Sequence, residues 1–397
     1  MNEESKQAML VPEPGALTPL EHITPSIYEA SIHCTAKAAW YALGGRSVLP
    51  ENPAAMLGSA FHSVMAAAHR GELMVANEAD RNPARRHFDE SARALYLQAH
   101  PLIKLKFPTL ERLPYYNVQR ERAALLAARI ASSRSWSAGP PVMTSNAAPR
   151  PLQTEFRLSS TDGLIVGRAD HVDGESQTVV DYKSGYIGEA DTDAVSDSEA
   201  RQLRLYAYLA AENGVNVSKG AIVRRDGQRC ELAISRADAE IEANSARRRL
   251  HEINAAIREG VRFDGLASPS SQSCRGCPCI ALCDSFWAEA NPVWQSDCGS
   301  HVEGCVSGAQ TRQILGVSLT TLALGVQRGT VSGERLSAEQ IPSDWMTLGS
   351  GSLPQAGDVI RVVYGRVFGA GEGAVVIRID KTLTSVWRVP PEGEGGR

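Results

Sequence analysis

The chain has 397 residues, which is long for one domain and fits two, and its formal net charge of −4 excludes a protein coated in basic surface. This charge still permits a nucleic-acid ligand, because only the binding groove has to be positive. There is no apolar run of about 18 residues or more, so we expect no membrane span. The first residues, 1–20, are expected to be disordered and lack the basic-then-apolar order of a signal peptide. We therefore expect a cytoplasmic protein that does not act at a membrane.

Two helices are predicted near the N-terminus. The apolar residues of the segment 23–43 recur at helical spacing, and Cys34 falls on that inward stripe. Residues 53–70 predict a second helix, which ends at Gly71 and carries His62. Taken alone, a histidine on such a helix is more often a core side chain than a metal ligand.

The stretch 163–185, GLIVGRADHVDGESQTVVDYKSG, predicts a β-hairpin, because two apolar runs flank the Asp-Gly turn signal at 173–174. Asp170 lies on the first strand, and Asp181 and Lys183 lie on the second. Side chains of a strand alternate between its two faces, so Asp181 and Lys183 share one face. The hairpin thus carries two carboxylates and one ammonium group.

The pairing of the two strands decides whether these three side chains meet. A two-residue loop at 174–175 would pair Asp170 with Val179. Asp181 would then lie diagonally two residues further along, and the two carboxylates would be roughly 7–8 Å apart at Cα. A hard divalent cation can bridge that gap. A loop of odd length would break this arrangement, and a solvated face with ordinary salt bridges is the alternative.

The segment after the hairpin changes from acidic to helical. Residues 186–200 hold five acidic residues and no basic one, so we expect a solvated loop. Residues 200–213 predict a helix that ends at Gly214. Gln202 and Tyr206, four residues apart, lie on one face of it. Further strands are expected at 220–224 and 230–234, followed by a helix over 236–259.

A cysteine cluster follows. Cys274, Cys277 and Cys283 have C-x2-C-x5-C spacing, and Cys279 is extra. Three thiolates within ten residues indicate a metal site, and a tetrahedral site needs a fourth ligand, for which Cys34 is the candidate. Four thiolates suit either an iron–sulfur cluster or zinc. Structural zinc more often has two C-x2-C pairs, which favours iron–sulfur, with unliganded thiols as the third alternative.

The last hundred residues, 300–397, predict a small accessory domain. The segment 306–330 has a weak helix-turn-helix pattern with Gly316 at the turn. A β-barrel, OB-like, is an equal alternative, because several later runs have β-type composition and glycine-rich turns. These runs are 358–367, 374–380 and 385–389.

The hairpin motifs resemble a known family. G-x-x-D at 167–170 and V-V-D-Y-K-S-G at 179–185 resemble the PD-(D/E)xK nuclease superfamily, and within it the RecB-like branch that includes the nuclease domains of AddB and of CRISPR-adaptation exonucleases. The resemblance implies an α/β fold over residues 21–295, with a restriction-endonuclease-like mixed central sheet flanked by helices. It also implies Mg²⁺ or Mn²⁺ held by His62, Asp170, Asp181 and the backbone carbonyl of Tyr182.

The resemblance assigns further roles. Lys183 would act with Asp170 and Asp181 in catalysis, while Gln202 and Tyr206 match a Q-x-x-x-Y motif that positions substrate or the active-site loop. AddB-type nucleases hold a 4Fe-4S cluster with one cysteine before the nuclease motifs and three after them. The matching residues are Cys34, Cys274, Cys277 and Cys283, with structural Zn²⁺ as the alternative. Such a cluster would clamp the ends of the nuclease domain.

The expected function is metal-dependent DNA hydrolysis. Relatives with this cluster degrade single-stranded ends, so we expect an exonuclease in repair, recombination, phage replication or defence. No G-x4-G-K-[ST] motif is present, so a helicase partner would supply any unwinding. The alternatives are a non-catalytic DNA-end-binding subunit of a helicase–nuclease complex and a scaffolding subunit.

Overall fold

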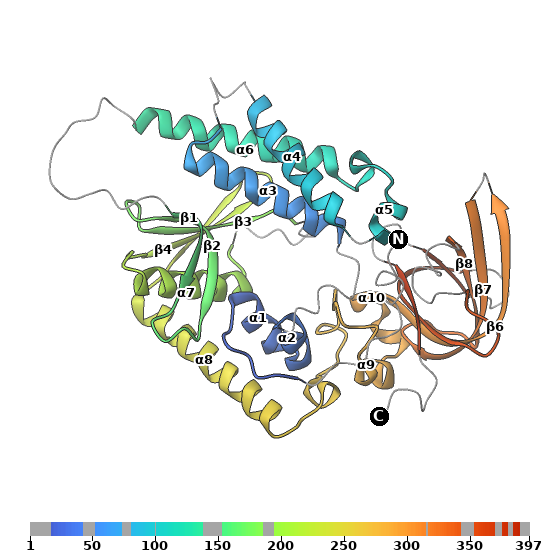
Figure 1. The fold of residues 1–397 in the computed structure, drawn as a ribbon. Coiled ribbons are helices and arrows are strands. Elements are labelled where there is room, and N and C mark those ends of the chain that lie inside the picture. Colours follow the sequence, from blue (N-terminus) through green and yellow to red (C-terminus); the bar gives the residue numbers. More distant parts are fainter. Residues whose placement is uncertain are drawn as a thin grey trace.

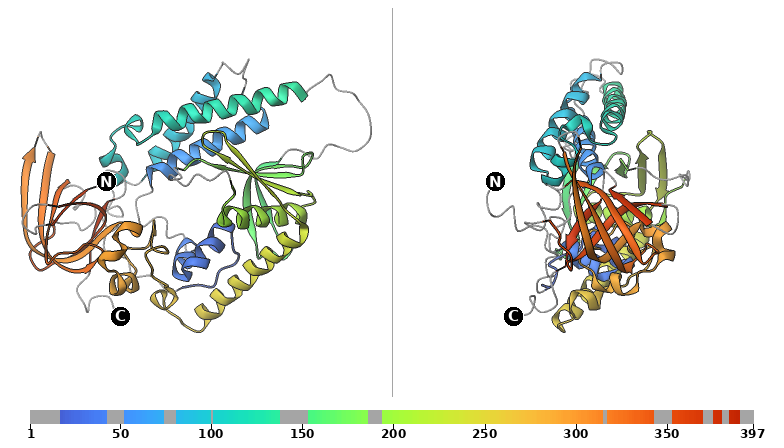
Figure 2. Two further views of the ribbon diagram at one scale, coloured as in Figure 1. Left: turned by 180° about the vertical axis from the view of Figure 1, so that it is seen from behind. Right: turned by 90° about the vertical axis from the view of Figure 1, so that its right-hand side faces the viewer.

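A computed structural model describes ten stretches of the chain. A helix-flanked sheet and a strand-rich C-terminal region lie at opposite ends of the molecule, with α1 (Pro25–His33) and α2 (Thr35–Ala42) between them (Figure 1). Figure 2 shows the same order from behind. The described residues are 17–42, 52–73, 81–99, 101–137, 153–185, 194–314, 317–342, 353–369, 375–379 and 384–389.

A five-stranded sheet forms the centre of the first part, in the order β1-β2-β3-β4-β5. Its strands are β1 (Gln153–Ser159), β2 (Val166–Asp173), β3 (Thr178–Lys183), β4 (Lys219–Arg224) and β5 (Arg229–Ala233). β3 and β4 are parallel, because the helix α7 (Asp197–Glu212) carries the chain from one to the other, and the remaining neighbours are antiparallel. The sheet is therefore mixed.

Helices cover both faces of this sheet (Figure 1). One face carries α3 (Pro53–Arg70), α4 (Asn82–Gln98) and α6 (Tyr116–Ser137); the other carries α7 and α8 (Arg236–Arg258). The side chains of β3 alternate accordingly. Val180 and Tyr182 belong to the apolar core under α3, whereas Val179 belongs to the core under α7. The predicted fold class, a mixed sheet flanked by helices, is confirmed.

The helix predicted over 23–43 is divided into α1 and α2. The Thr24 hydroxyl caps α1 by accepting a hydrogen bond from the Ile27 N–H. The backbone of Cys34 is extended, with φ −159° and ψ 116°, and this ends α1. Cys34 therefore lies between the two helices, half-buried against the core that contains Cys274.

The helix α3 begins and ends where its sequence predicts. Asn52 caps it, Pro53 occupies its first position, and Gly71 closes it in the left-handed conformation with φ 76°. These local signals place His62 in the middle of the helix. The shorter elements of the chain are α5 (Pro101–Lys106), η3 (Leu110–Arg112), η4 (Phe263–Leu266), α9 (Asp284–Glu289), η5 (Pro292–Trp294) and α10 (Gln295–Cys298).

The acidic stretch 186–200 is only partly accounted for by the structure. Residues 186–193 lie outside the described part of the chain. Glu199 lies in the first turn of α7, is buried, and forms an ion pair with Arg224 of β4. It also completes a capping box with Ser196. The prediction of a solvated loop is therefore wrong for Glu199, because a cation distant in the sequence neutralises it.

Residues 1–16 of the predicted disordered tail also lie outside the described residues. At Leu20, near the end of that tail, the backbone N–H donates to Asn254 Oδ1 at 2.6 Å, and the carbonyl accepts from Asn254 Nδ2 at 2.9 Å. Leu20 is buried. The chain is therefore anchored on α8 before α1 begins.

Strands build the C-terminal region: β6 (Ser300–Ile314), β7 (Val317–Gly329), β8 (Arg335–Pro342), β9 (Val359–Gly369), β10 (Val375–Ile379) and β11 (Ser385–Arg388). Among the described strands, the order β10-β8-β7-β6-β9 is closed by a β9–β10 pairing, and β11 adds to β9. β8 and β10 pair in parallel and the other neighbours are antiparallel. This is a five-stranded barrel of the Greek-key type found in OB folds.

The helix-turn-helix alternative for 306–330 is wrong. These residues belong to β6 and β7, apart from residues 315–316, which lie outside the described residues, and residue 330 beyond the end of β7. Thr320, Leu322 and Leu324 are buried at every second position, which is the period of a strand. The barrel alternative is confirmed.

An arginine joins the barrel to the cysteine-rich segment. Arg361 of β9 donates to the Ala281 carbonyl and to Asp284 Oδ1, each at 2.7 Å. Its Nε donates to Glu303 Oε2 of β6, also at 2.7 Å. The guanidinium therefore holds residues of both parts, and we call Arg361, Ala281, Asp284 and Glu303 the joint.

Apolar and phenolic contacts reinforce this attachment. The Tyr364 hydroxyl donates to the Cys277 carbonyl at 2.9 Å. Val363 and Trp387 belong to the same apolar core as the cysteine cluster. The division expected between 295 and 300 therefore separates two parts of the chain that share a core.

Candidate functional site

The hairpin differs from its predicted register. The strands pair as His171 with Val180 and Val172 with Val179, so the loop is longer than the expected two residues. Asp173 causes the extension, because its carboxylate accepts bonds from the Glu175 N–H at 2.9 Å and the Ser176 hydroxyl at 2.6 Å. The predicted pairing of Asp170 with Val179 is therefore wrong.

The longer loop still has an even number of residues, so Asp170, Asp181 and Lys183 remain on the same face of the sheet, as predicted. Continued by one residue, the observed register places Asp170 beside Asp181. The ladder between β2 and β3 ends at this point, and Asp170 Oδ2 accepts a hydrogen bond from the Tyr182 N–H at 2.8 Å. Where β2 and β3 separate, the Asp170 carboxylate thus accepts the hydrogen bond of a β3 backbone N–H in place of a backbone carbonyl.

The second oxygen of Asp170 contacts α3. His62 Nδ1 lies 2.9 Å from Asp170 Oδ1. Burial opposes protonation of His62, but the hydrogen bond and charge of Asp170, together with the charge of Asp181, raise the pKa of the imidazole. His62 is therefore a polar partner of the hairpin and not a core side chain.

Asp181 is the most deeply buried charge of the group, with 7% of its side chain exposed. Gln202 Nε2 donates to Oδ1 at 2.9 Å. Oδ2 has the ammonium group of Lys183 at 2.8 Å but no hydrogen bond of good geometry. Burial raises the pKa of Asp181; Asp170 adds to this effect and Lys183 opposes it.

The helix α7 connects these groups. Gln202 Oε1 accepts from Lys183 Nζ at 2.7 Å, and its Nε2 also lies 3.3 Å from the Tyr206 hydroxyl. One amide therefore bridges Asp181 and Lys183. Burial and the charge of Asp181 raise the pKa of Tyr206, so its phenol stays protonated.

All the predicted hairpin, α3 and α7 residues line one cavity of about 370 Å³, which we call the acidic cavity. The lining consists of Ser59, His62, Arg168, Asp170, Asp181, Tyr182, Lys183, Ser184, Gly185, Gln202 and Tyr206. Carboxylates, an imidazole and an ammonium group therefore converge from β2, β3, α3 and α7.

Several lining residues were not predicted. Arg168 precedes Asp170 by two positions on β2, and this period-two spacing was an available signal. Ser184 follows Lys183, and its carbonyl accepts from Gln119 Nε2 of α6 at 2.7 Å. A Cβ at Gly58 would come within 2.8 Å of the Ser184 hydroxyl oxygen. The glycine inside α3 thus allows close approach of the segment after β3.

The donor set suits a hard divalent cation, since it consists of carboxylate oxygens beside an imidazole. A buried carboxylate oxygen without a good hydrogen bond, Asp181 Oδ2, is the observation that favours such an ion. Within the described stretches, no group of three or more His, Cys, Asp or Glu residues is arranged as a metal site. The carboxylates instead contact donors of the protein: Lys183 pairs with Asp181, and the Tyr182 N–H donates to Asp170.

Cys274, Cys277 and Cys283 belong to one apolar core, and Cys34 packs against it. Cys274, Cys277 and Cys283 are buried, and Cys277 Sγ lies 3.3 Å from Cys279 Sγ. Burial, with smaller effects of Cys277 and Cys34, raises the pKa of Cys274 to about 11. Cys34 is therefore within electrostatic reach of the C-terminal thiols, as the sequence spacing alone could not establish.

Comparison with known families agrees with this geometry. A family model of the PD-(D/E)XK nuclease superfamily matches residues 22–284, which is more than half of the chain. The chain therefore belongs to the PD-(D/E)XK nuclease superfamily. Members of this superfamily are nucleases that typically use Mg²⁺ or Mn²⁺, and a nuclease domain implies DNA as substrate.

One further comparison and one property of the helices complete these findings. No curated protein matches the chain. Among the helices in the described ranges, none combines the length and the apolar character needed to cross a bilayer.

Proposed function

We propose that this chain is a Mg²⁺- or Mn²⁺-dependent deoxyribonuclease of the RecB-like branch that degrades single-stranded DNA from an end. The observation that supports it most directly is the convergence of Asp170, Asp181 and Lys183 on the acidic cavity. Two neighbouring carboxylates repel each other unless cations offset them. Lys183 and the imidazole of His62 do so here, and a metal ion would do so during the reaction.

The metal would be held by His62, Asp170, Asp181 and the backbone carbonyl of Tyr182. When bound, it supplies Lewis acidity toward a phosphate oxygen and lowers the pKa of its coordinated water. Lys183 orients the attacking water and offsets the negative charge that builds on the phosphate. Burial keeps these interactions in a medium of low dielectric constant, where they are strongest.

Gln202 and Tyr206 hold this set in place. Because the Gln202 amide bonds both Asp181 and Lys183, it fixes the distance between the carboxylate and the ammonium group. Tyr206 is buried, and its hydroxyl lies 3.3 Å from Gln202 Nε2, so it supports the amide. We propose that both residues position the reacting groups and the DNA strand.

Cys34, Cys274, Cys277 and Cys283 are proposed to hold a 4Fe-4S cluster, with structural zinc as the alternative. The burial of the last three and the effect of Cys34 on the pKa of Cys274 support a shared site. Cys279, whose sulfur contacts that of Cys277, is the alternative ligand. Anaerobically purified protein should be brown with broad visible absorbance; a colourless protein containing zinc would contradict the iron–sulfur assignment.

The test of the nuclease proposal is incubation with end-labelled single- and double-stranded DNA in Mg²⁺, Mn²⁺ or EDTA. Loss of label from single strands with either metal, and none in EDTA, is expected. Binding without cleavage would instead support the non-catalytic DNA-end-binding subunit, and neither binding nor cleavage would support a scaffold. A helicase partner is proposed to supply any unwinding.

A further inference from the structure

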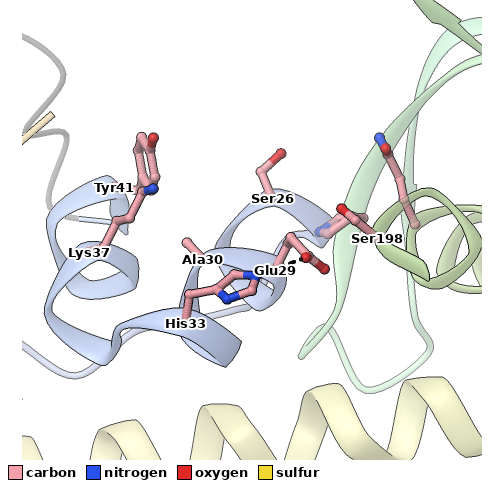
Figure 3. Close-up of a pocket in the computed structure, with 9 residues that line it drawn as sticks. Ser26, Glu29, Ala30, His33, Lys37, Tyr41 and Ser198 are labelled. Atoms are coloured by element: carbon pink, nitrogen blue, oxygen red, sulfur yellow. Dashed lines mark hydrogen bonds and ion pairs between the residues drawn. The ribbon is translucent and has the colours of Figure 1, made fainter. Parts of the chain in front are cut away.

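A second cavity lies beside Gln202, on the side of α1 and α2. It measures about 410 Å³, and the residues used below are Ser26, Glu29, His33, Lys37, Tyr41 and Ser198 (Figure 3). Gln202 lines this cavity as well as the acidic cavity. The two cavities therefore share a wall, and we call the second one the α1–α2 cavity.

The single carboxylate in this lining is already neutralised. Arg201 donates to both oxygens of Glu29, at 2.8 and 2.9 Å, and His33 Nε2 lies 3.4 Å from Oε1. Ser198 also bonds Glu29. Burial would raise the pKa of Glu29, but the Arg201 bonds and charge lower it, so the carboxylate stays ionised. Glu29 thus adds little net negative charge to the cavity.

The charge of Lys37, unlike that of Glu29, is not neutralised by an ion pair among the described residues. Lys37 is half-buried on α2. Tyr41 lies one helical turn further along, so the ammonium group and the phenol ring share one face of α2 (Figure 3). The hydroxyl of Ser26, an exposed residue, comes from α1. The cavity therefore offers a cation, a hydroxyl and an aromatic ring, with its acid neutralised.

We propose that the α1–α2 cavity binds the nucleotide next to the cleaved phosphodiester of a single DNA strand. This rests on the proposed function. Lys37 contacts the phosphate of that nucleotide as a point charge, and the Ser26 hydroxyl donates to a phosphate oxygen. Tyr41 supplies a surface on which a base stacks, which suits a single strand of any sequence. The strand passes Gln202 between the two cavities.

Lys37 also lies within electrostatic reach of the cysteine-rich segment. Hydrogen bonding from Cys279 lowers the pKa of Cys277, and Lys37 contributes to this shift. The alternative role of Lys37 is therefore to stabilise the thiolates of the cysteine cluster and not to bind DNA. This role predicts loss of the cluster when the lysine is replaced, whereas the proposed role predicts loss of DNA affinity alone.

The test compares Lys37→Gln with Lys219→Gln in the full chain. Lys219 is an exposed lysine at the start of β4 and pairs with Thr178, at the opposite end of β3 from Lys183. Affinity for fluorescent oligothymidylate is measured in EDTA over a range of salt. We expect Lys37→Gln to weaken binding about fivefold and to reduce the slope of log K against log salt by about 0.7, the value for one phosphate contact on a single strand. Lys37→Arg should retain binding, and Lys219→Gln should match wild type.

Neutral methylphosphonate linkages then locate the contact. Placed at the contacted phosphate, such a linkage should weaken wild type about as much as Lys37→Gln does, and should weaken Lys37→Gln no further. With Mg²⁺ or Mn²⁺, Lys37→Gln should raise KM about fivefold and leave kcat unchanged, and its visible absorbance should equal that of wild type.

Two results with the variants would overturn the inference: equal affinity of Lys37→Gln and Lys219→Gln, or loss of visible absorbance in Lys37→Gln with DNA affinity unchanged. Failure of wild type to bind single strands would overturn it as well. If wild type binds DNA but does not cut it, the nuclease proposal fails, and the binding comparison still decides the role of Lys37.

Discussion

The joint and the acidic cavity both bury charge, but they satisfy it differently. The Arg361 side chain is 4% exposed, and its three nitrogens bond Glu303, Ala281 and Asp284 at 2.7 Å. Its guanidinium carbon also lies 5.2 Å from the ring centre of Trp287. Asp181 is buried nearly as deeply, but one of its oxygens has no good hydrogen bond.

This difference indicates different roles. A buried ionic group whose partners are all in place contributes rigidity, and removing one partner is costly. A buried carboxylate with a raised pKa, one of whose oxygens has an ion pair but no hydrogen bond, lowers the stability of the folded chain at neutral pH, so its presence is better explained by chemistry than by stability. The joint holds the molecule together, and the acidic cavity is where it is proposed to act.

The largest effect is expected at Asp181. Asp181→Ala should lower cleavage of single-stranded DNA by about a thousandfold or more, which corresponds to about 4 kcal/mol, because the proposed metal loses a ligand. Lys183→Ala should lower cleavage by a similar factor, because the ammonium group that orients the water and offsets the phosphate charge is lost. Full activity in either purified variant would refute the assignment of the site.

Replacing the Asp181 carboxylate by a neutral amide should not destabilise the fold. A carboxyl whose folded pKa is raised loses stability as the pH rises above its unfolded pKa, so replacing Asp181 by Asn should stabilise the chain at pH 7 and have less effect near pH 4. Thermal unfolding at the two pH values measures this. A large drop in stability at pH 7 would show that Asp181 is structural.

The joint should respond in the opposite way. Arg361→Met leaves the buried Glu303 with only the longer ion pair to Arg328, at 3.5 Å, and should destabilise the chain by about 3–5 kcal/mol. The double variant with Glu303→Gln should recover part of the loss. Denaturant unfolding of the single and double variants gives the comparison. An unchanged midpoint in Arg361→Met would contradict the structural role.

A buried histidine of β6, His301, should also make the fold sensitive to acid. Burial lowers the pKa of His301 to about 4, although its bond to the Cys298 carbonyl opposes this. A histidine with a depressed folded pKa stabilises above its unfolded pKa of about 6.5 and loses that contribution as pH falls toward 4. About 2 kcal/mol should be lost between pH 7 and pH 5. His301→Gln should show a smaller loss in the same thermal measurement, and an equal loss would exclude His301 as the source.

The smallest effect is expected at Gln202. Gln202→Ala removes the bridge between Asp181 and Lys183 and should lower kcat about tenfold, with little change in the KM for DNA. Tyr206→Phe removes only the longer bond to Gln202, at 3.3 Å, and keeps the ring, so it should lower kcat less than Gln202→Ala does, by about twofold. A change confined to KM in Gln202→Ala would instead assign the amide to substrate binding.

Local signals in the sequence predicted much of the fold. Asn52, Pro53 and Gly71 delimit α3, and the strand pairs around residues 170 and 221 follow from alternation and turn residues. The hairpin register was predicted incorrectly, because Asp173 closes a longer turn with its own side chain. The even length of that turn preserved the faces.

The barrel and its attachment were harder to foresee. Residues 306–330 have apolar positions that fit either a helix or a strand over short lengths, and pairing of β6 with β7 and β9 decided between them. Nothing in the sequence around Arg361 indicates that it reaches Ala281, which is 80 residues away in the chain.

By itself, the sequence determined which residues share a strand face or a helix face, because side-chain periodicity and caps depend only on neighbouring residues. Tertiary structure decided the partners. His62 meets Asp170 across 108 residues, and Gln202 bridges Asp181 and Lys183 only because α7 crosses over β3. Such contacts depend on how helices pack on the sheet, and packing is a property of the whole chain.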